Sequence, residues 1–180
     1  QLMDFERMLV GELPFSEAAS YFLRLKDFNK TASPDETGLV EGQFTVPLGD
    51  ALALMADMVA NEFKTLYAYR AYAESLRGLS HGSVADEFEE HAGNELEHAE
   101  WLMRRMSVLG GALHLPDIPA PPASTDPVAI VKLMIEMEQA GIAKWQALHA
   151  IMGENPSKYE IENFLTREQH HLDELWQLLP

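Results

Sequence analysis

The stretch GGALHLPDIPAPPAST, residues 110–125, decides the fold because it separates two pairs of helical segments and cannot be helical itself. Each of its four prolines lacks a backbone N–H and has a fixed φ angle, which prevents a regular helix. An extended chain advances ~3.1 Å per residue, so this stretch is long enough to run the length of a helical bundle. We therefore interpret it as a crossover between two hairpins.

Four long segments with helical periodicity lie outside this crossover, and none has a proline beyond its first or last turn. They cover residues 48–77, 83–109 and 126–153, and the residues from 157 to the end of the chain. About five residues join the first two segments and about four join the last two, and links this short force antiparallel hairpins. The sequence therefore predicts an all-α fold, a four-helix bundle of two antiparallel hairpins joined by one long crossover.

Cap signals mark the boundaries of these helices. Gly78 is placed to end the first helix in the left-handed conformation. Ser83 and Ser157 each stand three residues before an acid, which is the spacing of a capping box at the start of the second and fourth helices. Asp126 is an N-cap for the third helix, because a proline follows it at the first helical position.

Residues 1–47 do not continue the bundle pattern, and we interpret them as an N-terminal extension. Within them, residues 16–28 carry apolar side chains at helical spacing and are expected to form a short amphipathic helix. The bundle itself is expected to occupy residues 48–180 as one domain, which agrees with a total length of 180 residues.

Charge and composition exclude several classes of function. Thirteen Lys and Arg against 29 Asp and Glu give a net charge of −16, so we expect no binding to nucleic acid or to an anionic membrane surface. A metal cation is the more natural ligand. The absence of cysteine excludes disulfides, iron–sulfur clusters and thiolate zinc sites. No apolar run approaches the ~20 residues of a membrane span, and we expect a cytoplasmic protein.

Two Glu-x-x-His motifs carry the chemistry, Glu95 with His98 in the second predicted helix and Glu168 with His171 in the fourth. Both glutamates share a helix face with apolar residues, so they are expected to point into the core. A single acid on such a face is ordinarily a salt-bridged side chain or one that reaches back to solvent. An ionised carboxylate inside a core is costly unless it is paired or binds a metal.

The first and third predicted helices each supply a matching acid on an apolar face, Glu62 and Glu138. A helix rises 1.5 Å per residue, so the distances from these acids to their hairpin turns can be compared with those of the Glu-x-x-His motifs. The comparison places all four carboxylates and both imidazoles at one level of the bundle. Oxygen and nitrogen donors without sulfur indicate a dinuclear site for iron or manganese.

Other acids and histidines are expected to have different roles. Glu97 and Glu136 lie two residues from expected ligands and should point to the surface. His91 precedes His98 by one heptad, and we interpret it as a packed residue or one that supports a ligand rather than as a ligand itself. His170 is expected to be solvated.

Residues 48–179 resemble the bacterioferritin and Dps-like branch of the ferritin superfamily. The resemblance rests on Glu-x-x-His-Ala at residues 95–99, Leu-Gly-Gly at 109–111 and Glu-x-x-His at 168–171. It implies a ferritin-like four-helix bundle with a diiron–carboxylate centre. The site residues that it implies are the terminal carboxylates Glu62 and Glu138, the bridging carboxylates Glu95 and Glu168, the imidazoles His98 and His171, and Tyr69 close to the centre.

Two departures from the relatives narrow what the resemblance implies. Bacterioferritins ligate haem with a methionine directly after the glutamate of the second helix, and because this chain has Leu96 there we expect no haem. Rubrerythrins carry a further glutamate ligand three residues after the acid of the third helix, together with a cysteine-rich module. This chain has Gly141 at that position and no cysteine.

The resemblance therefore implies a ferroxidase-type oxidoreductase with two iron ions per chain, or manganese in their place. It would oxidise Fe(II) with O2 or H2O2 for iron storage or detoxification, as a homo-oligomer that is either a hollow cage or a dimer. Two alternatives stay open. One is a diiron oxidase or peroxidase without a cage, rubrerythrin-like or acting on a small molecule, and the other is a metal-free structural helical bundle.

Overall fold

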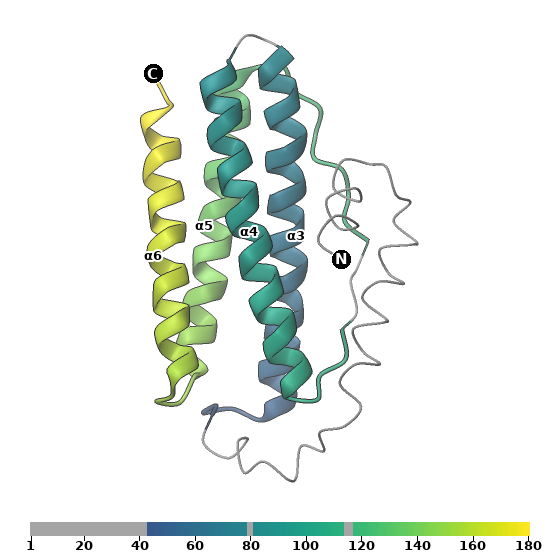
Figure 1. The fold of residues 1–180 in the computed structure, drawn as a ribbon, viewed down its shortest axis with the longest axis vertical. Helices are drawn as coiled ribbons and strands as arrows, with labels where there is room; N and C mark the ends of the chain where they lie inside the picture. Colours follow the sequence, from purple (N-terminus) through teal and green to yellow (C-terminus); the bar gives the residue numbers. More distant parts are fainter. Residues whose placement is uncertain (1–42, 79–80, 114–116) are drawn as a thin grey trace.

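The computed structural model describes residues 43–78, 81–113 and 117–180. These residues contain the helices α3 (Leu48–Gly78), α4 (Gly82–Val108), α5 (Pro127–Ile151) and α6 (Pro156–Gln177) (Figure 1). The short helix predicted over residues 16–28 lies outside the described residues.

The four helices form two antiparallel hairpins, α3 with α4 and α5 with α6 (Figure 1). The crossover after α4 runs back along the outer side of α3 to the start of α5. The predicted all-α four-helix bundle with one long crossover is therefore confirmed. No helix in the described part of the chain is both long and apolar enough to cross a membrane.

The helix starts predicted from cap signals are confirmed at α5 and α6, at α6 with a different capping residue. The Asp126 carboxylate accepts a hydrogen bond of 3.0 Å from the Val128 N–H, as predicted for an N-cap. At α6 the capping residue is Asn155, whose Oδ1 accepts from the Ser157 N–H at 2.9 Å. The capping box predicted at Ser157 is wrong, because Ser157 already lies inside the first turn of the helix.

The capping box predicted at the start of α4 is also wrong. The helix begins at Gly82, and its N-cap His81 makes no side-chain cap hydrogen bond. Ser83 is therefore already helical and is not the residue before the helix. The acid of the predicted capping box, Asp86, instead accepts a hydrogen bond of 3.0 Å from Arg77 of α3.

The left-handed glycine is at the end of α4 and not at Gly78. Gly78 is the last residue of α3, whereas Gly110 has a φ of 76°. The Gly111 N–H donates to the Met106 carbonyl at 2.8 Å, which closes α4 with a Schellman motif. A Cβ on Gly111 would lie 2.7 Å from Leu52 Cδ2, so a side chain there would force this contact with α3 to move.

The core consists of two apolar clusters with a polar level between them. One cluster gathers Met55, Met58, Phe63, Leu102, Trp145 and Phe164, and the other gathers Tyr72, Leu76, Phe88, Ile130, Met134 and Leu175. Along α3, for example, the first cluster ends at Phe63 and the second begins at Ala68. The acids and histidines of the two Glu-x-x-His motifs lie at the level between the clusters.

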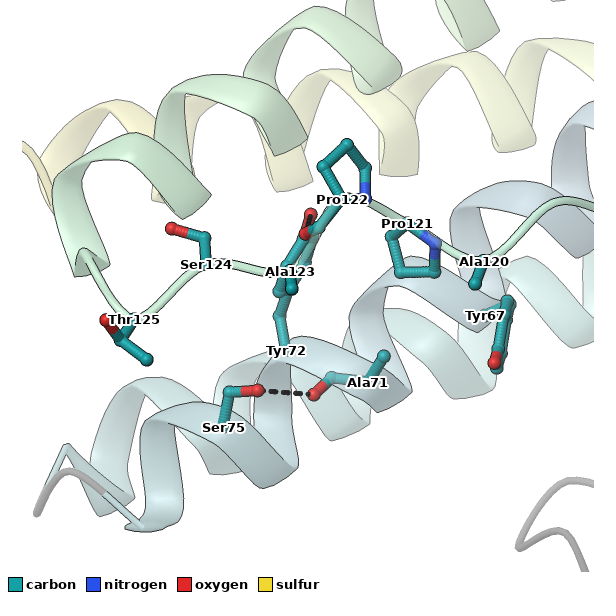
Figure 2. A pocket seen from close by; sticks show the side chains of 10 residues that line it. All are labelled: Tyr67, Ala71, Tyr72, Ser75, Ala120, Pro121, Pro122, Ala123, Ser124 and Thr125. Atoms are coloured by element: carbon teal, nitrogen blue, oxygen red, sulfur yellow. Dashed lines mark hydrogen bonds between the residues drawn. The ribbon is translucent and has the colours of Figure 1, made fainter.

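A pocket of about 450 Å³ lies between α3 and the crossover (Figure 2). Tyr67, Tyr72 and residues 120–125 contribute to its lining, and the Tyr72 hydroxyl donates a hydrogen bond of 2.7 Å to the Pro122 carbonyl. None of its lining residues is charged or a histidine. This pocket therefore offers no carboxylate or imidazole to a metal ion, and the Tyr72–Pro122 hydrogen bond fastens the crossover to the bundle.

The cap of α5 predicts a measurable contribution to stability. Replacing Asp126 with alanine removes the acceptor for the Val128 N–H and should lower the free energy of unfolding by about 1 kcal/mol. Urea denaturation of the metal-free protein measures this loss. Ser83→Ala is the matched control, and a loss as large in this variant would contradict the assignment of the caps.

Candidate metal centre

The bundle brings the six predicted ligands together at its middle level. Each helix contributes from the face that it turns to the core, and i and i+3 spacing puts each Glu-x-x-His pair on one face. The six residues are Glu62 of α3, Glu95 and His98 of α4, Glu138 of α5, and Glu168 and His171 of α6. All are at most 2% exposed, so water has no direct access to them.

The six residues form two overlapping groups. In the first group, which is Glu62, Glu95, His98 and Glu168, one ligand atom from each residue lies within 4.8 Å of the others. The His98 Nδ1 atom is 3.1 Å from Glu168 Oε1 and 3.5 Å from Glu62 Oε2. It is 3.8 Å from Glu95 Oε2.

The second group consists of Glu95, Glu138, Glu168 and His171, again with ligand atoms within 4.8 Å of one another. The His171 Nδ1 atom is 3.4 Å from Glu95 Oε1, 3.7 Å from Glu138 Oε1 and 3.8 Å from Glu168 Oε2. Glu95 and Glu168 therefore belong to both groups, and each turns one oxygen toward either imidazole. This geometry suits two adjacent cations that share two carboxylates.

Several polar atoms of these groups are buried without a hydrogen-bond partner in the described structure. They are both carboxylate oxygens of Glu62 and of Glu168, Oε1 of Glu95, both ring nitrogens of His98, and Nδ1 of His171. An unpaired buried polar atom costs about 1–3 kcal/mol, and these atoms converge on one point. Oxygen and imidazole donors that lack partners are the donors that iron or manganese takes, so the residues present fit a dinuclear metal site.

Burial and mutual repulsion raise the pKa values of three carboxyl groups of the centre, Glu62, Glu138 and Glu168. Burial, together with the charge of Glu95, raises the pKa of Glu62 to about 8. The same two causes raise the pKa of Glu168 to about 7. Burial and the charge of Glu168 also raise the pKa of Glu138.

The two imidazoles differ in their protonation. Burial lowers the pKa of His171 to about 4, and the charge of His98 acts in the same direction. Burial also acts to lower the pKa of His98, but the close carboxyl groups of Glu168, Glu62 and Glu95 outweigh it and raise that pKa. His98 therefore supplies a positive charge among the acids, while His171 is neutral.

Residues around the centre orient the second group more than the first. The Tyr69 hydroxyl donates to Glu138 Oε1, and the Asn94 side-chain amide lies 3.0 Å from His171 Nε2. His91 stacks on His171 with 4.2 Å between ring centroids. By contrast, His98 meets the ring faces and edges of Trp145 and Phe164. The resemblance indicated Tyr69, but nothing in the sequence singled out Asn94.

The residues expected to face solvent do so. Glu136 is exposed, and Glu97 is exposed and pairs with Arg167 at 2.8 Å. His170 is 71% exposed and pairs with Glu174. Gly141, which stands where rubrerythrins have a further ligand, adds no side chain to the centre.

Between pH 6.5 and 8 we expect the metal-free protein to lose stability as the pH rises. Glu62 and Glu138 are ionised in the unfolded chain but hold protons in the fold, and His98 also binds its proton more tightly when folded. The folded state therefore binds more protons, and stability falls by up to about 1.4 kcal/mol per pH unit for each group. His91 and His171 act in the opposite sense only below pH 6.5.

Thermal unfolding of the metal-free protein across this range measures the effect. Saturating metal should abolish or reverse the trend, because the metal replaces the protons on the carboxyl groups. A melting temperature that rises from pH 6.5 to pH 8 without metal would contradict the raised carboxyl pKa values.

Comparisons with known proteins agree with this fold. A search of curated protein sequences returns no match. Among solved structures, the chain is similar to a dodecameric thioferritin, the bacterioferritin-related protein of Bacteroides fragilis, with a TM-score of 0.70 and 20% sequence identity. The match covers 81% of this chain and 92% of that chain, and it shows a shared fold. Because the model of the ferritin-like domain matches residues 52–179, the chain belongs to the ferritin-like domain family.

Proposed function

We propose that the protein binds two iron ions per chain at the six-residue centre and oxidises Fe(II) for iron storage or detoxification. The observation that carries this proposal is the pair of overlapping ligand groups that share Glu95 and Glu168. A metal-free structural bundle would not explain why four carboxyl groups are buried and why several of their oxygen atoms have no hydrogen-bond partner in the described structure. Membership of the ferritin-like family supports the same conclusion.

The ligand roles follow from which residues the two groups share. Glu95 and Glu168 would bridge the two ions, because each turns one oxygen toward either imidazole. Glu62 and Glu138 each belong to only one of these two groups and would be terminal ligands. Four carboxylates would cancel the charge of two divalent ions, which allows the ions to lie close together in a dry core. Manganese suits the same donors.

Iron is the substrate, and the reaction balances with either oxidant. Two Fe(II) ions give up two electrons, which with two protons convert H2O2 into two water molecules or O2 into H2O2. The ligands must lose protons when the ions bind, and the oxidation then consumes protons. The chain's part is to hold the ions at a fixed separation, to exclude bulk water and to exchange these protons.

Tyr69 has a positioning role in this proposal. Its hydroxyl donates to Glu138 Oε1 and lies 3.0 Å from His91 Nδ1, so it fixes the orientation of one terminal carboxylate. Asn94 acts similarly on His171 through the ring nitrogen that faces away from the acids.

A homo-oligomer completes the proposal. The structurally similar thioferritin is dodecameric, and closed symmetric shells are the usual result when identical chains associate repeatedly. A net charge of −16 per chain would attract Fe(II) to such a shell. We therefore propose that the protein stores iron in a hollow cage. The alternative is a dimeric oxidase, which a measurement of the native mass would distinguish from a cage.

The centre should bind two metal ions per chain, and Glu95→Ala should abolish binding of the pair because Glu95 belongs to both groups. Elemental analysis after anaerobic loading with Fe(II) measures the stoichiometry. Glu97→Ala is the matched control, since Glu97 is two residues away and points to the surface. Fewer than one ion per chain in the wild type, or equal losses in both variants, would refute the site.

A second measurement separates storage from simple oxidation. Multi-angle light scattering should give a mass of many chains, and aerobic addition of Fe(II) should load far more than two ions per chain. A dimer that still oxidises Fe(II) would favour the oxidase without a cage. A mass of one chain would refute the oligomer.

A further inference from the structure

A separate cluster of metal-ligating side chains lies outside the centre, between α4 and α6. This α4–α6 cluster consists of Glu87 and His91 of α4 and Glu174 of α6, and one ligand atom from each residue lies within 4.8 Å of the others. His91 Nε2 is 3.0 Å from Glu174 Oε2 and 3.9 Å from Glu87 Oε1. None of the three residues is among the six ligands of the proposed two-ion centre.

The distances in the α4–α6 cluster fit three ligands of one cation. Ligand atoms that each lie about 2.0–2.2 Å from a shared transition-metal ion are about 3–4 Å apart. The two distances from His91 Nε2, 3.0 and 3.9 Å, lie within this range. The cluster therefore holds one imidazole nitrogen and two carboxylate oxygens at separations that a single cation requires.

A hydrogen bond with Tyr69 orients the His91 ring toward the two carboxylates. The Tyr69 hydroxyl donates its single hydrogen to Glu138, so its oxygen accepts from the His91 Nδ1–H at 3.0 Å. A neutral imidazole has no second N–H, and Nε2 then presents a lone pair to Glu174 and Glu87. Histidine ligands of metals usually donate their other ring N–H in this way. Three acceptors that face one another are favourable only with a cation between them.

No basic side chain compensates the two carboxylates of the cluster. Within the described part of the chain, Glu87 and Glu174 form ion pairs only with histidines. By contrast, Glu89 and Glu97, which also belong to α4, each pair with an arginine. Burial and the charge of Glu174 raise the pKa of Glu87, as expected for like charges that face each other.

We propose that Glu87, His91 and Glu174 form a third metal site, which takes one divalent transition-metal ion such as Fe²⁺, Mn²⁺ or Co²⁺. Two carboxylates balance the charge of one divalent ion, and the imidazole favours a transition metal over Mg²⁺ or Ca²⁺. The exposed fraction is 36% at Glu87 and 26% at Glu174, but only 2% at His91. Ions can therefore enter this site from solvent on its carboxylate side, unlike the buried centre.

The third site lies directly beside the centre but does not depend on it. His91 stacks on His171 with 4.2 Å between ring centroids, so the two sites are separated by one pair of stacked imidazoles. They share no ligand, and an ion can bind at the third site while the centre is empty. This inference therefore goes beyond the proposed function and can be tested separately from it.

The test measures Co²⁺ binding to metal-free full-length protein by equilibrium dialysis. Excess Mg²⁺ is present, because it occupies exposed carboxylates but does not compete well where an imidazole is a ligand. The wild type should bind three Co²⁺ per chain, two in the centre and one at the third site. Glu174→Gln keeps the shape of the side chain but removes its charge, and this variant should bind two.

Glu87→Gln removes a second ligand and serves if Glu174→Gln folds poorly. It should weaken binding of the third ion at least tenfold and leave the other two unchanged. Anomalous scattering from crystals soaked in Co²⁺ should place the third ion about 2.0–2.2 Å from His91 Nε2 in the wild type.

Two further variants serve as controls. Glu162→Gln should bind three Co²⁺, because the Glu162–His149 pair has the same 3.0 Å distance as the Glu174–His91 pair but belongs to no group of three ligands among the described residues. Glu95→Ala removes a ligand that both groups of the centre share and should retain one Co²⁺ per chain.

The outcomes separate the third site from the centre. Two Co²⁺ in the wild type that both persist in Glu174→Gln would overturn the third site alone, as would equal losses in Glu174→Gln and Glu162→Gln. One Co²⁺ in the wild type that is lost in Glu174→Gln would support the third site and refute the two-ion centre. A wild type that binds no Co²⁺ would overturn both.

Discussion

The burial of four carboxyl groups at one level of an apolar bundle is the constraint on which the rest of the structure depends. Carboxylates so close in a low-dielectric core repel one another, and the pKa values of Glu62, Glu138 and Glu168 rise as a result. The surrounding core compensates for this repulsion. One apolar cluster lies on each side of the polar level, so apolar packing holds the bundle together at both ends, and the middle level can hold charged groups.

Much of this arrangement could be predicted because it depends on regular periodicities. The crossover is recognisable from its prolines, and two short links then fix which helices are antiparallel. Once the helices are fixed, the rise per residue determines which side chains share a level. Glu62 and Glu138 could be paired with the Glu-x-x-His motifs for this reason, although neither acid belongs to a motif of its own.

Two kinds of feature could not be predicted from the sequence. One is the cap of a helix, where neighbouring residues compete for the same role, and the other is a contact between side chains of different helices. Ser83 stands at capping-box spacing, but α4 starts at Gly82 and the partner acid pairs with Arg77 of the preceding helix. Asn94 carries no signal because its partner, His171, lies on another helix. His91 was predicted to support a ligand because it lies one heptad before His98, but its contacts with Tyr69 and Glu174 require three helices to be in place.

The two Glu-x-x-His motifs are equivalent in sequence and differ in their surroundings. His98 lies against aromatic rings and keeps a positive charge among the acids, while His171 is neutral, stacked on His91 and bonded to Asn94. One side of the centre is thus packed with aromatic rings and the other with polar side chains. Because the ligand set is nearly symmetric, this difference can come only from the side chains that pack behind the ligands. The chemistry of the two halves is therefore set by residues of all four helices that no ligand motif includes.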